Sequence, residues 1–448
     1  MARVGAVDYL GMCGMDSLLD WSLVTGPLPV VLLLAGGAAL LALGAVRGDR
    51  RWWTRTVPLV GLVTAAVVGA TALAVTLAAP FPDPLPLVVW GSVGVGVGAV
   101  ALGVAVGIRG RTRVRARAAL AVVVVLLAAA NQVNTFFGEY PTIRTALGLA
   151  PIGQVDFAQV TTGAPLVIAP EGQPLASVWR PPPGMPATGR VSEVVIPATV
   201  SRFAARPAWL YLPPAYLSRT RAQLPVLVLL GGQPGEPRSW LDGGRLAAML
   251  DRFAAAHDGL APVAVLPDNL GSRLANPLCV DSHLGKVATY LAVDVPTWIR
   301  STLQIDTAPG SWAIGGFSAG GTCALQLATN APRVYPTFID ISGQIEPTLG
   351  TRARTVDAVF AGNAAAFTAI NPLDLLATHR YPQSAGTVVV GTADPTYRAE
   401  DQQVAAAARR AGMTIVYREL PGGHTWHVWG PGLETSLPWL AHRLRLTP

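Results

Sequence analysis

Four long segments without a charged residue occupy the first third of the chain. Residues 27–46, 57–79, 87–108 and 118–137 consist mostly of Leu, Val, Ala and Gly. A helix needs about 20 such residues to cross the hydrocarbon core of a bilayer, so each segment is predicted to be a transmembrane helix. Arginine clusters separate these segments, which is not typical of the buried helices of a soluble protein. We expect a four-helix transmembrane domain over residues 1–137.

The loops between these segments differ in charge. Residues 80–86, between the second and third segments, contain no basic residue. Loops rich in Lys and Arg stay on the cytoplasmic side of a membrane. The pattern therefore predicts a multi-pass cell-membrane protein whose amino terminus, and whose residues after about 138, face the outside. The arginines of the other two loops are Arg47, Arg50, Arg51, Arg55, Arg109, Arg111, Arg113, Arg115 and Arg117.

The charge balance argues against nucleic acid as a partner and leaves the lipid bilayer as the expected one. The net charge is +7, but the nine loop arginines and Asp49 together contribute +8, so the rest of the chain sums to −1. No basic surface then remains to bind phosphates. The predicted spans contain no ionisable residue, and such residues mark ion pathways in transporters. A transporter is therefore disfavoured.

Three cysteines, Cys13, Cys279 and Cys323, would all face the outside, where disulfides form and persist. Cys279 and Cys323 are the pair to test because both fall in the downstream region, and two buried free thiols are the alternative. The sequence contains no Cys/His spacing of the zinc type. We expect no metal site and no cofactor.

The remainder of the chain, roughly 310 residues, is long enough for one large α/β domain. Residues 138–189 are rich in Pro and Gly and are predicted to form a linker or an extended arm. From residue 190 to residue 448, short apolar runs alternate with helical patterns, which predicts a mostly parallel sheet with helices on both faces. The predicted strands are residues 191–196, 208–212, 225–230, 263–266, 311–315, 337–341, 387–390 and 414–420, and the predicted helices include 246–256, 286–303, 321–328 and 400–411.

The pentapeptide Gly-Phe-Ser-Ala-Gly at residues 316–320 follows a predicted strand and precedes a predicted helix. A nucleophile elbow needs this arrangement, because the glycines let a strained turn pass close to its neighbours and expose the serine hydroxyl. The motif predicts Ser318 as a catalytic nucleophile rather than a simple strand-to-helix turn.

A serine hydroxyl needs a neighbouring base, and the base needs an orienting acid. His424 and His427 follow the last predicted strand, and the two glycines before His424 favour it because they let the loop bend towards the elbow. Asp394 lies after the preceding strand and is the predicted acid. Glu400 and Asp401 are its rivals, although acidic residues that open a helix are ordinarily caps or first-turn residues. The chain order Ser, Asp, His is that of α/β-hydrolases.

The oxyanion of an acyl-transfer reaction needs two preorganised donors. The backbone N–H of Ala319, directly after the nucleophile, is the first predicted donor. The second is expected from the glycine-rich loop at residues 231–235, from Gln233 or Gly232, and Gly232 would also contact the substrate. Aromatic side chains predicted to line an apolar substrate pocket, with plain core packing as the alternative, are Trp240, Trp426 and Trp429.

Together these motifs resemble the esterase D and feruloyl-esterase branch of the α/β-hydrolases, to which the mycolyltransferases of bacterial envelopes are related. The resemblance implies an α/β-hydrolase fold, the triad Ser318, Asp394 and His424, and an oxyanion hole lined by Gln233 and Ala319. The loop that begins at Cys279 is similar to one found in membrane-anchored bacterial members. The matching pieces are Trp-Leu-Tyr-Leu-Pro-Pro (209–214), the 231–235 loop followed by Trp240, Gly-Phe-Ser-Ala-Gly-Gly (316–321), Gly-Thr-Ala-Asp (391–394) and Gly-Gly-His-Thr-Trp (422–426).

The sequence therefore predicts a membrane-anchored, extracytoplasmic serine esterase that works through an acyl-enzyme. The anchor favours a lipid or cell-envelope substrate, such as a lipid ester, an aminoacyl phospholipid or an envelope glycolipid. If a sugar or lipid hydroxyl replaces water, the same site is an acyltransferase. A non-catalytic membrane scaffold with a hydrolase-like fold is a further alternative, against which the intact Ser-Asp-His set argues. The sequence leaves the oligomeric state undetermined.

Overall fold

The computed structural model describes residues 18–46, 49–78, 84–108, 110–160 and 163–448. The chain divides into two compact units, Met1–Leu149 and Ala150–Pro448. The predicted linker at residues 138–189 is thus divided between them, and most of it belongs to the second unit. Cys13 lies outside the described residues.

The first unit contains four helices that are long and apolar enough to cross a membrane, as predicted. The fourth predicted segment was shorter than the helix observed, which begins six residues before residue 118, because the arginine-rich stretch is itself helical. The fourth helix contacts both the first and the third, and the second contacts the third. The four are α2 (Pro27–Ala45), α3 (Val57–Ala78, continuous with the π-helical turn Trp52–Thr56), α4 (Leu87–Ile108) and α5 (Thr112–Phe137), followed by the short α6 (Ile143–Ala146).

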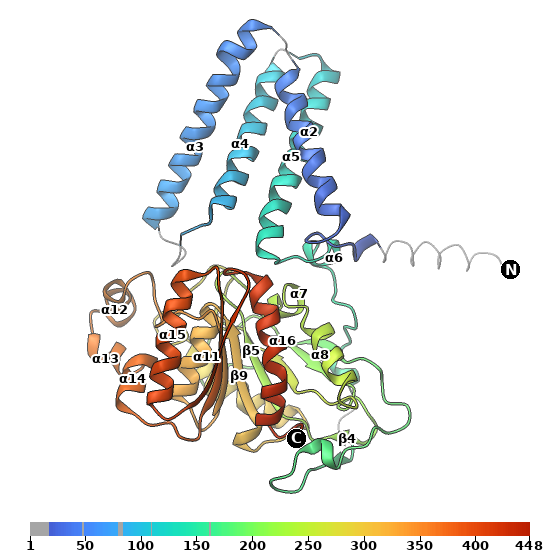
Figure 1. Cartoon of the computed structure of the whole chain (residues 1–448), viewed down its shortest axis with the longest axis vertical. Coiled ribbons are helices and arrows are strands. Elements are labelled where there is room, and N and C mark those ends of the chain that lie inside the picture. The colour runs from blue at the N-terminus through green and yellow to red at the C-terminus, as the bar shows by residue number, and fades with distance from the viewer. Residues whose placement is uncertain (1–17, 47–48, 79–83, 109, 161–162) are drawn as a thin grey trace, which may run out of the picture. The chain divides into compact units, whose positions relative to one another are not determined.

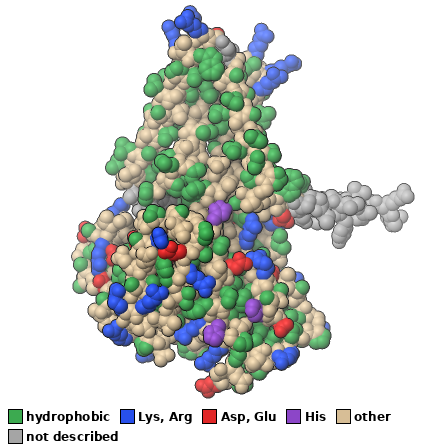
Figure 2. Space-filling model, viewed as in Figure 1, with side chains coloured by type: hydrophobic (Ala, Val, Ile, Leu, Met, Phe, Trp, Pro, Cys, Tyr) green, Lys and Arg blue, Asp and Glu red, His purple; other side chains and the backbone are tan. Residues whose placement is uncertain are grey.

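Close packing in this unit depends on glycine. A side chain on Gly36 of α2 would collide with Ala128 of α5, and one on Gly103 of α4 would collide with Val122 of α5. Small residues let membrane helices approach in this way. Apolar side chains cover the outside of the helices, and basic side chains gather at the end where the two arginine-rich loops lie (Figure 2). This surface suits a hydrocarbon environment with one charged border.

The second unit is built on an eight-stranded sheet with the order β12-β11-β10-β9-β5-β6-β3-β2. Six neighbouring strands, from β12 to β6, are parallel, and β3 and β2 complete one edge in antiparallel pairing. The α/β-hydrolase fold predicted from the sequence is confirmed. The strands are β2 (Arg190–Val194), β3 (Ala208–Leu212), β5 (Val226–Leu230), β6 (Val263–Leu266), β9 (Trp312–Phe317), β10 (Thr337–Ile341), β11 (Ala385–Gly391) and β12 (Thr414–Leu420).

Helices cover both faces of this sheet (Figure 1). Alternate residues of β5 separate the two cores: Val226 and Val228 pack on the side of α10, α11 and α15, whereas Leu227 and Leu229 pack on the side of α8 and α16. A central parallel strand is apolar on both faces for this reason. The covering helices are α8 (Leu246–Ala255), α10 (Val295–Thr302), α11 (Ala319–Asn330), α15 (Pro395–Arg410) and α16 (Trp426–Arg443).

Smaller elements complete the unit. The predicted helix at 286–303 is interrupted, because a π-helical turn (Tyr290–Asp294) separates the short α9 (Val287–Thr289) from α10. Three helices between β10 and β11 were not predicted: α12 (Arg352–Phe360), α13 (Ala364–Thr368) and α14 (Pro372–Thr378). The remaining elements are α7 (Ser239–Asp242), the strand pairs β1 (Leu166–Val167) with β4 (Arg221–Ala222) and β7 (Asp281–Ser282) with β8 (Gly285–Lys286), and the 3-10 turns Phe157–Gln159, Leu175–Ser177 and Pro309–Ser311.

Residues 150–189 form an arm that packs on the sheet unit rather than a free linker. The backbone N–H of Leu175 donates to the carbonyl oxygen of Arg445 at 2.8 Å, and that of Ala176 donates to Leu446 at 3.1 Å. Leu175 and Trp179 are buried in the larger core, and the Trp179 Nε1–H donates to the carbonyl of Asp258 at 2.8 Å. Pro and Gly give the arm its irregular path, and these apolar anchors hold it in place.

Candidate active site

Ser318 lies in a sharp turn between β9 and α11. Its backbone has φ 52° and ψ −127°, a conformation that is strained for a residue with a side chain and that persists at functional sites. A side chain on Gly316 would collide with the backbone of Gly320, and one on Gly320 would collide with the carbonyl of Leu230. Both glycines are therefore required for the turn, as a nucleophile elbow demands.

A continuous hydrogen-bonded chain joins the three residues predicted as a triad. The Oγ of Ser318 lies 2.9 Å from Nε2 of His424, and Nδ1 of His424 lies 2.9 Å from Oδ2 of Asp394. Ser318 and Asp394 are each only 6% exposed, so these bonds are largely shielded from water. The geometry is that of a serine with a neighbouring base and an orienting carboxylate.

The parallel sheet brings these side chains together because Ser318, Asp394 and His424 each follow the carboxyl end of a strand, β9, β11 and β12 respectively. Asp394 occupies the N-cap position of α15, yet its side chain makes no capping bond and accepts from the imidazole instead. The rival Glu400 accepts from the backbone N–H of Ile345 at 2.8 Å. The rival base His427 is exposed and lies in the first turn of α16.

Aromatic rings of the core pack against the turn that carries Ser318. Phe317, next to the nucleophile, stacks on Trp429 with centroids 4.4 Å apart and packs against Trp240 and Trp426. Trp240 is fully buried and its Nε1–H donates to the carbonyl of Leu230, while Trp426 is 4% exposed. Trp240 and Trp426 therefore pack in the core, which was the alternative to the predicted substrate contact. These rings have almost no surface for a ligand.

Sequence reasoning missed one ring at the site itself. Tyr397 stacks on the imidazole of His424, with centroids 4.0 Å apart and planes inclined by 28°, and Trp429 meets the same imidazole edge-on at 5.0 Å. Tyr397 lies in the first turn of α15, three residues after Asp394. An aromatic residue one turn after a candidate acid is the signal that could have identified it.

The loop predicted to supply the second oxyanion donor lies against the nucleophile. A side chain on Gly232 would come within 2.6 Å of the Phe317 ring and 3.2 Å of the Ser318 Cβ. The side chain of Gln233 turns away and donates from Nε2 to the carbonyl of Leu274 at 3.0 Å. The side-chain amide of Gln233 is thus engaged with Leu274, and its backbone N–H is the donor considered for an oxyanion. Ala319 is partly exposed and opens α11, where the first N–H groups have no acceptor within the helix.

A disulfide joins Cys279 to Cys323, the pair proposed from the sequence. Cys323 lies on α11 within two turns of Ser318, and Cys279 lies in the loop before β7. Leu278 and Cys279 both have positive φ values, 61° and 57°. The disulfide therefore fastens an unusual loop conformation to the helix that carries the nucleophile.

A second group of carboxyls is buried near the triad acid. Burial, aided by the charge of Glu400, raises the pKa of Asp340, in β10, to about 7, against the lowering effect of a backbone hydrogen bond from Gly343. Burial, followed by the charge of Asp340, raises the pKa of Asp401 well above its usual range. Both side chains are fully buried, and the carboxyl of Asp401 has no hydrogen-bond partner within the described chain. The two groups therefore favour their protonated forms.

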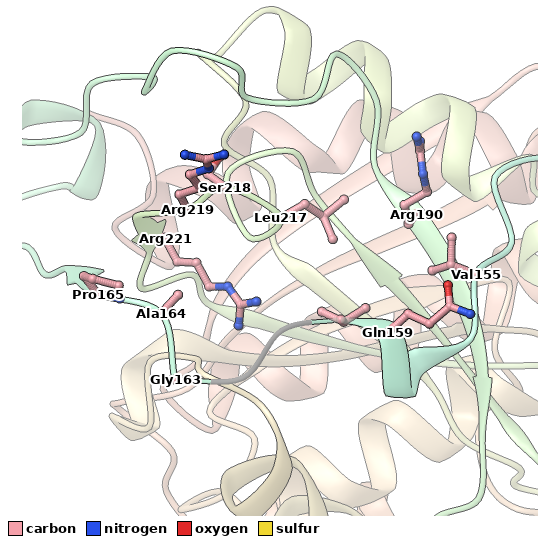
Figure 3. Close-up of a pocket in the computed structure, with 11 residues that line it drawn as sticks. Val155, Gln159, Gly163, Ala164, Pro165, Arg190, Leu217, Ser218, Arg219 and Arg221 are labelled. Carbon is pink, nitrogen blue, oxygen red and sulfur yellow. The ribbon is translucent and has the colours of Figure 1, made fainter.

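Cavities also lie away from these side chains in the described residues. One, of about 530 Å³, is lined by Arg190, Arg219 and Arg221 together with apolar side chains (Figure 3), and no member of the proposed triad lines it. Another, of about 560 Å³, is an apolar groove within the first unit, bordered by α3, α4 and α5. A group of three or more metal-ligating side chains is not present in the described part of the chain.

Residues 205–440 match the family model Esterase, described as putative esterase. Over 441 residues the chain is 36% identical to an uncharacterized protein of Corynebacterium glutamicum, covering 95% of this chain and 97% of that protein. The aligned region therefore extends over both units of this chain. The match to the Esterase family model spans more than half of the sequence and includes Ser318, Asp394 and His424.

Among solved structures, the chain is similar to a ferulic acid esterase, with 19% identity and a TM-score of 0.49 over 57% of this chain and 99% of the other. It is also similar to an S-formylglutathione hydrolase from Agrobacterium tumefaciens, with 18% identity and a TM-score of 0.47 over 58% of this chain and 97% of the other.

Proposed function

The chain belongs to the putative esterase family and is a carboxylic ester hydrolase, and from that premise we propose that it is a membrane-anchored serine esterase whose triad is Ser318, His424 and Asp394. The observation that carries the proposal is the continuous hydrogen-bonded chain from Asp394 through His424 to the Ser318 hydroxyl, at 2.9 Å in each bond. A strained elbow presents that hydroxyl at the carboxyl edge of the sheet.

In the proposed reaction, Nε2 of His424 takes the proton from the Ser318 hydroxyl as its oxygen attacks the ester carbonyl. The imidazolium then donates that proton to the departing alcohol, which leaves an acyl group on Ser318. Water attacks the acyl-enzyme with His424 again as the base, releasing the acid and restoring the serine. Asp394 holds the imidazole by its Nδ1–H and stabilises its charged form.

The negative charge that develops on the carbonyl oxygen needs donors already in place. We assign the Ala319 N–H as one of them, because it lies in the first turn of α11, beside the nucleophile. The proposed source of the second donor is the backbone of Gly232 and Gln233. Because Gly232 has no side chain, this backbone can lie against Ser318 and Phe317. Removing one such donor typically costs about 100- to 1,000-fold in rate.

The test is covalent labelling of the full chain in detergent with a fluorophosphonate, with the modified peptide located by mass spectrometry. Ser318 should be labelled in the unaltered protein, and the label should be lost in Ser318→Ala and fall sharply in His424→Ala. His427→Ala is the matched control, since it removes a nearby exposed histidine and should label normally. Folded protein that is not labelled at Ser318 would overturn the assignment.

We also propose that the four apolar helices cross the cell membrane and that the esterase unit faces the outside, where a lipid or envelope ester is its substrate. The two arginine-rich loops support this orientation, because they border the same end of the helices (Figure 2). In a Cys13→Ser background, a membrane-impermeant maleimide should label His442→Cys in intact cells and should label Arg51→Cys only after lysis. The reverse pattern would place the esterase unit in the cytoplasm.

A further inference from the structure

A small polar crevice lies beside the first turn of α11. It has a volume of about 10 Å³, which is close to the roughly 10–15 Å³ that one water molecule needs. The crevice can therefore hold one water-sized group. Its lining includes Ala319, whose N–H is a proposed oxyanion donor, together with Asn269, Asn276, Thr322, Gln326 and Gln344.

Four different segments build this crevice. Asn269 follows β6 and donates to the carbonyl of Gly231 at 2.9 Å, which ties it to the oxyanion loop. Gln344 follows β10, and its backbone N–H donates to the Thr322 hydroxyl at 2.8 Å. Gln326, on α11, donates to the carbonyl of Leu278 at 3.0 Å. The disulfide between Cys279 and Cys323 fastens the fourth side, so the walls are held before a ligand arrives.

Three amide atoms of these walls are not used by the protein. Asn269 and Gln326 each donate through nitrogen, which leaves their side-chain oxygens as acceptors, and Gln344 accepts from Thr322 through Oε1, which leaves its Nε2 as a donor. The three side chains are only 3–7% exposed. None of the three free atoms is among the described side-chain atoms that are both inaccessible to solvent and without a hydrogen-bond partner. They therefore remain open to a group in the crevice.

The chemistry of the lining selects the kind of group. The described residues that line the crevice include no charged side chain, so a buried phosphate, carboxylate or ammonium group would find no ion-pair partner among them. A hydroxyl group has one donor and two acceptor positions. It could accept from Gln344 Nε2 and donate to the oxygen of Asn269 or Gln326. The free atoms of the crevice thus complement a hydroxyl.

We propose that this crevice is a subsite for a neutral hydroxyl of the substrate, carried near the ester bond on either its alcohol or its acyl part. The inference rests on the proposed esterase function and deepens it: the preferred substrates are esters of polyols or of hydroxy acids. Gln344 is the main specificity residue, because its side-chain nitrogen donates no hydrogen bond to the protein, whereas the amide nitrogens of the other lining residues Asn269, Asn276 and Gln326 each donate one.

Two pairs of esters that differ only in hydroxyl groups test the subsite. Glycerol monobutyrate against propyl butyrate tests the alcohol part, and ethyl 3-hydroxybutyrate against ethyl butyrate tests the acyl part. In the unaltered protein kcat/KM should favour the hydroxylated ester of at least one pair. Gln344→Met should reduce that preference by about 3- to 10-fold, the effect of one neutral hydrogen bond, because it lowers kcat/KM for the hydroxylated ester more than for the plain ester. Gln173→Met, an exposed glutamine of the arm, is the matched control.

Fluorophosphonate labelling distinguishes a failure of the proposed esterase function from a failure of the subsite inference. Label on Ser318 in Gln344→Met shows that the triad is intact, and Gln344→Asn, which keeps the amide, serves if the methionine variant does not fold. If Ser318 is not labelled in the unaltered protein, the proposed esterase function fails. If Ser318 is labelled but neither ester pair shows a hydroxyl preference that depends on Gln344, the subsite inference fails alone. Equal loss on both members of a pair would also overturn it.

Discussion

The imidazole of His424 stacks on the ring of Tyr397, with centroids 4.0 Å apart. Asp394 fixes one nitrogen of the imidazole and Ser318 meets the other, but neither bond defines the tilt of the ring. The stacked tyrosine and the edge of Trp429 do so. Two aromatic contacts and two hydrogen bonds together hold the proposed base.

Replacing Tyr397 should therefore alter the rate more than the fold. Tyr397→Ala should lower kcat by roughly 10- to 100-fold, since small displacements of a catalytic group cost rates of this order. Tyr397→Phe keeps the ring and should retain most of the activity. Steady-state kinetics on a chromogenic ester measure both variants. Equal activity in the alanine variant would show that the stack does not position His424.

Asp394→Asn should remove the charge that orients and stabilises the imidazolium. The expected loss in kcat is about 10,000-fold, by analogy with the same change in a serine protease triad, and KM should change little. The folded protein should keep its melting temperature within a few degrees. Substantial activity in this variant would return Glu400 or Asp401 to consideration as the acid.

Gly232→Ala should disrupt the oxyanion loop. The added methyl group would lie 2.6 Å from the Phe317 ring and 3.2 Å from the Ser318 Cβ, so the loop or the elbow must shift. We expect at least a 100-fold loss of kcat/KM. Gly310→Ala is the control, because nothing lies within 4 Å of the position its side chain would take. A fully active Gly232→Ala protein would exclude this loop from the oxyanion hole.

The disulfide between Cys279 and Cys323 spans 44 residues. By the loop-entropy relation, a crosslink of this length stabilises the folded state by about 4 kcal/mol. The double variant Cys279→Ser/Cys323→Ser avoids a lone thiol and should unfold at a clearly lower denaturant concentration. An unchanged midpoint, or one that does not respond to a reductant in the unaltered protein, would count against this contribution.

The buried carboxyl of Asp340 predicts a pH dependence of stability. Burial raises its pKa to about 7 in the folded state, whereas an aspartate in the unfolded chain titrates near 3.9. The folded state therefore binds more protons between about pH 4 and pH 7, and the free energy of unfolding contributed by this group falls as the pH rises through that window. At pH 8 the cost is fully present. Asp340→Asn should flatten this fall in denaturant titrations at pH 5 and pH 8.

In the same titrations Asp401→Asn is the second variant, since the charge of Asp340 is among the causes that raise its pKa. Each single variant should be more stable than the unaltered protein at pH 8 and close to it at pH 5. An unaltered protein whose stability rises across this window would contradict the assignment.

The proximity of Ser318, Asp394 and His424 could be predicted from the sequence, because each residue follows a strand whose apolar pattern is plain. A parallel sheet brings such residues to one edge, so Ser318, Asp394 and His424 meet without any knowledge of side-chain geometry. Tyr397 and Gln344 were missed because their roles depend on which way a helix turn or a loop faces. Trp240 and Trp426 were predicted to contact the substrate, because a sequence does not distinguish an aromatic ring packed in the core under the nucleophile turn from one that lines a substrate pocket.

The family match begins at residue 205, whereas the compact unit begins at residue 150. About 55 residues upstream of the recognisable motif are thus part of the same folded body, tied through Leu175 and Ala176 to Arg445 and Leu446. A fragment cut at the edge of the sequence family would leave those carbonyl groups without their partners and open the larger core where Trp179 lies. The family match and the compact unit therefore begin at different residues, and only the compact unit keeps these contacts of the arm.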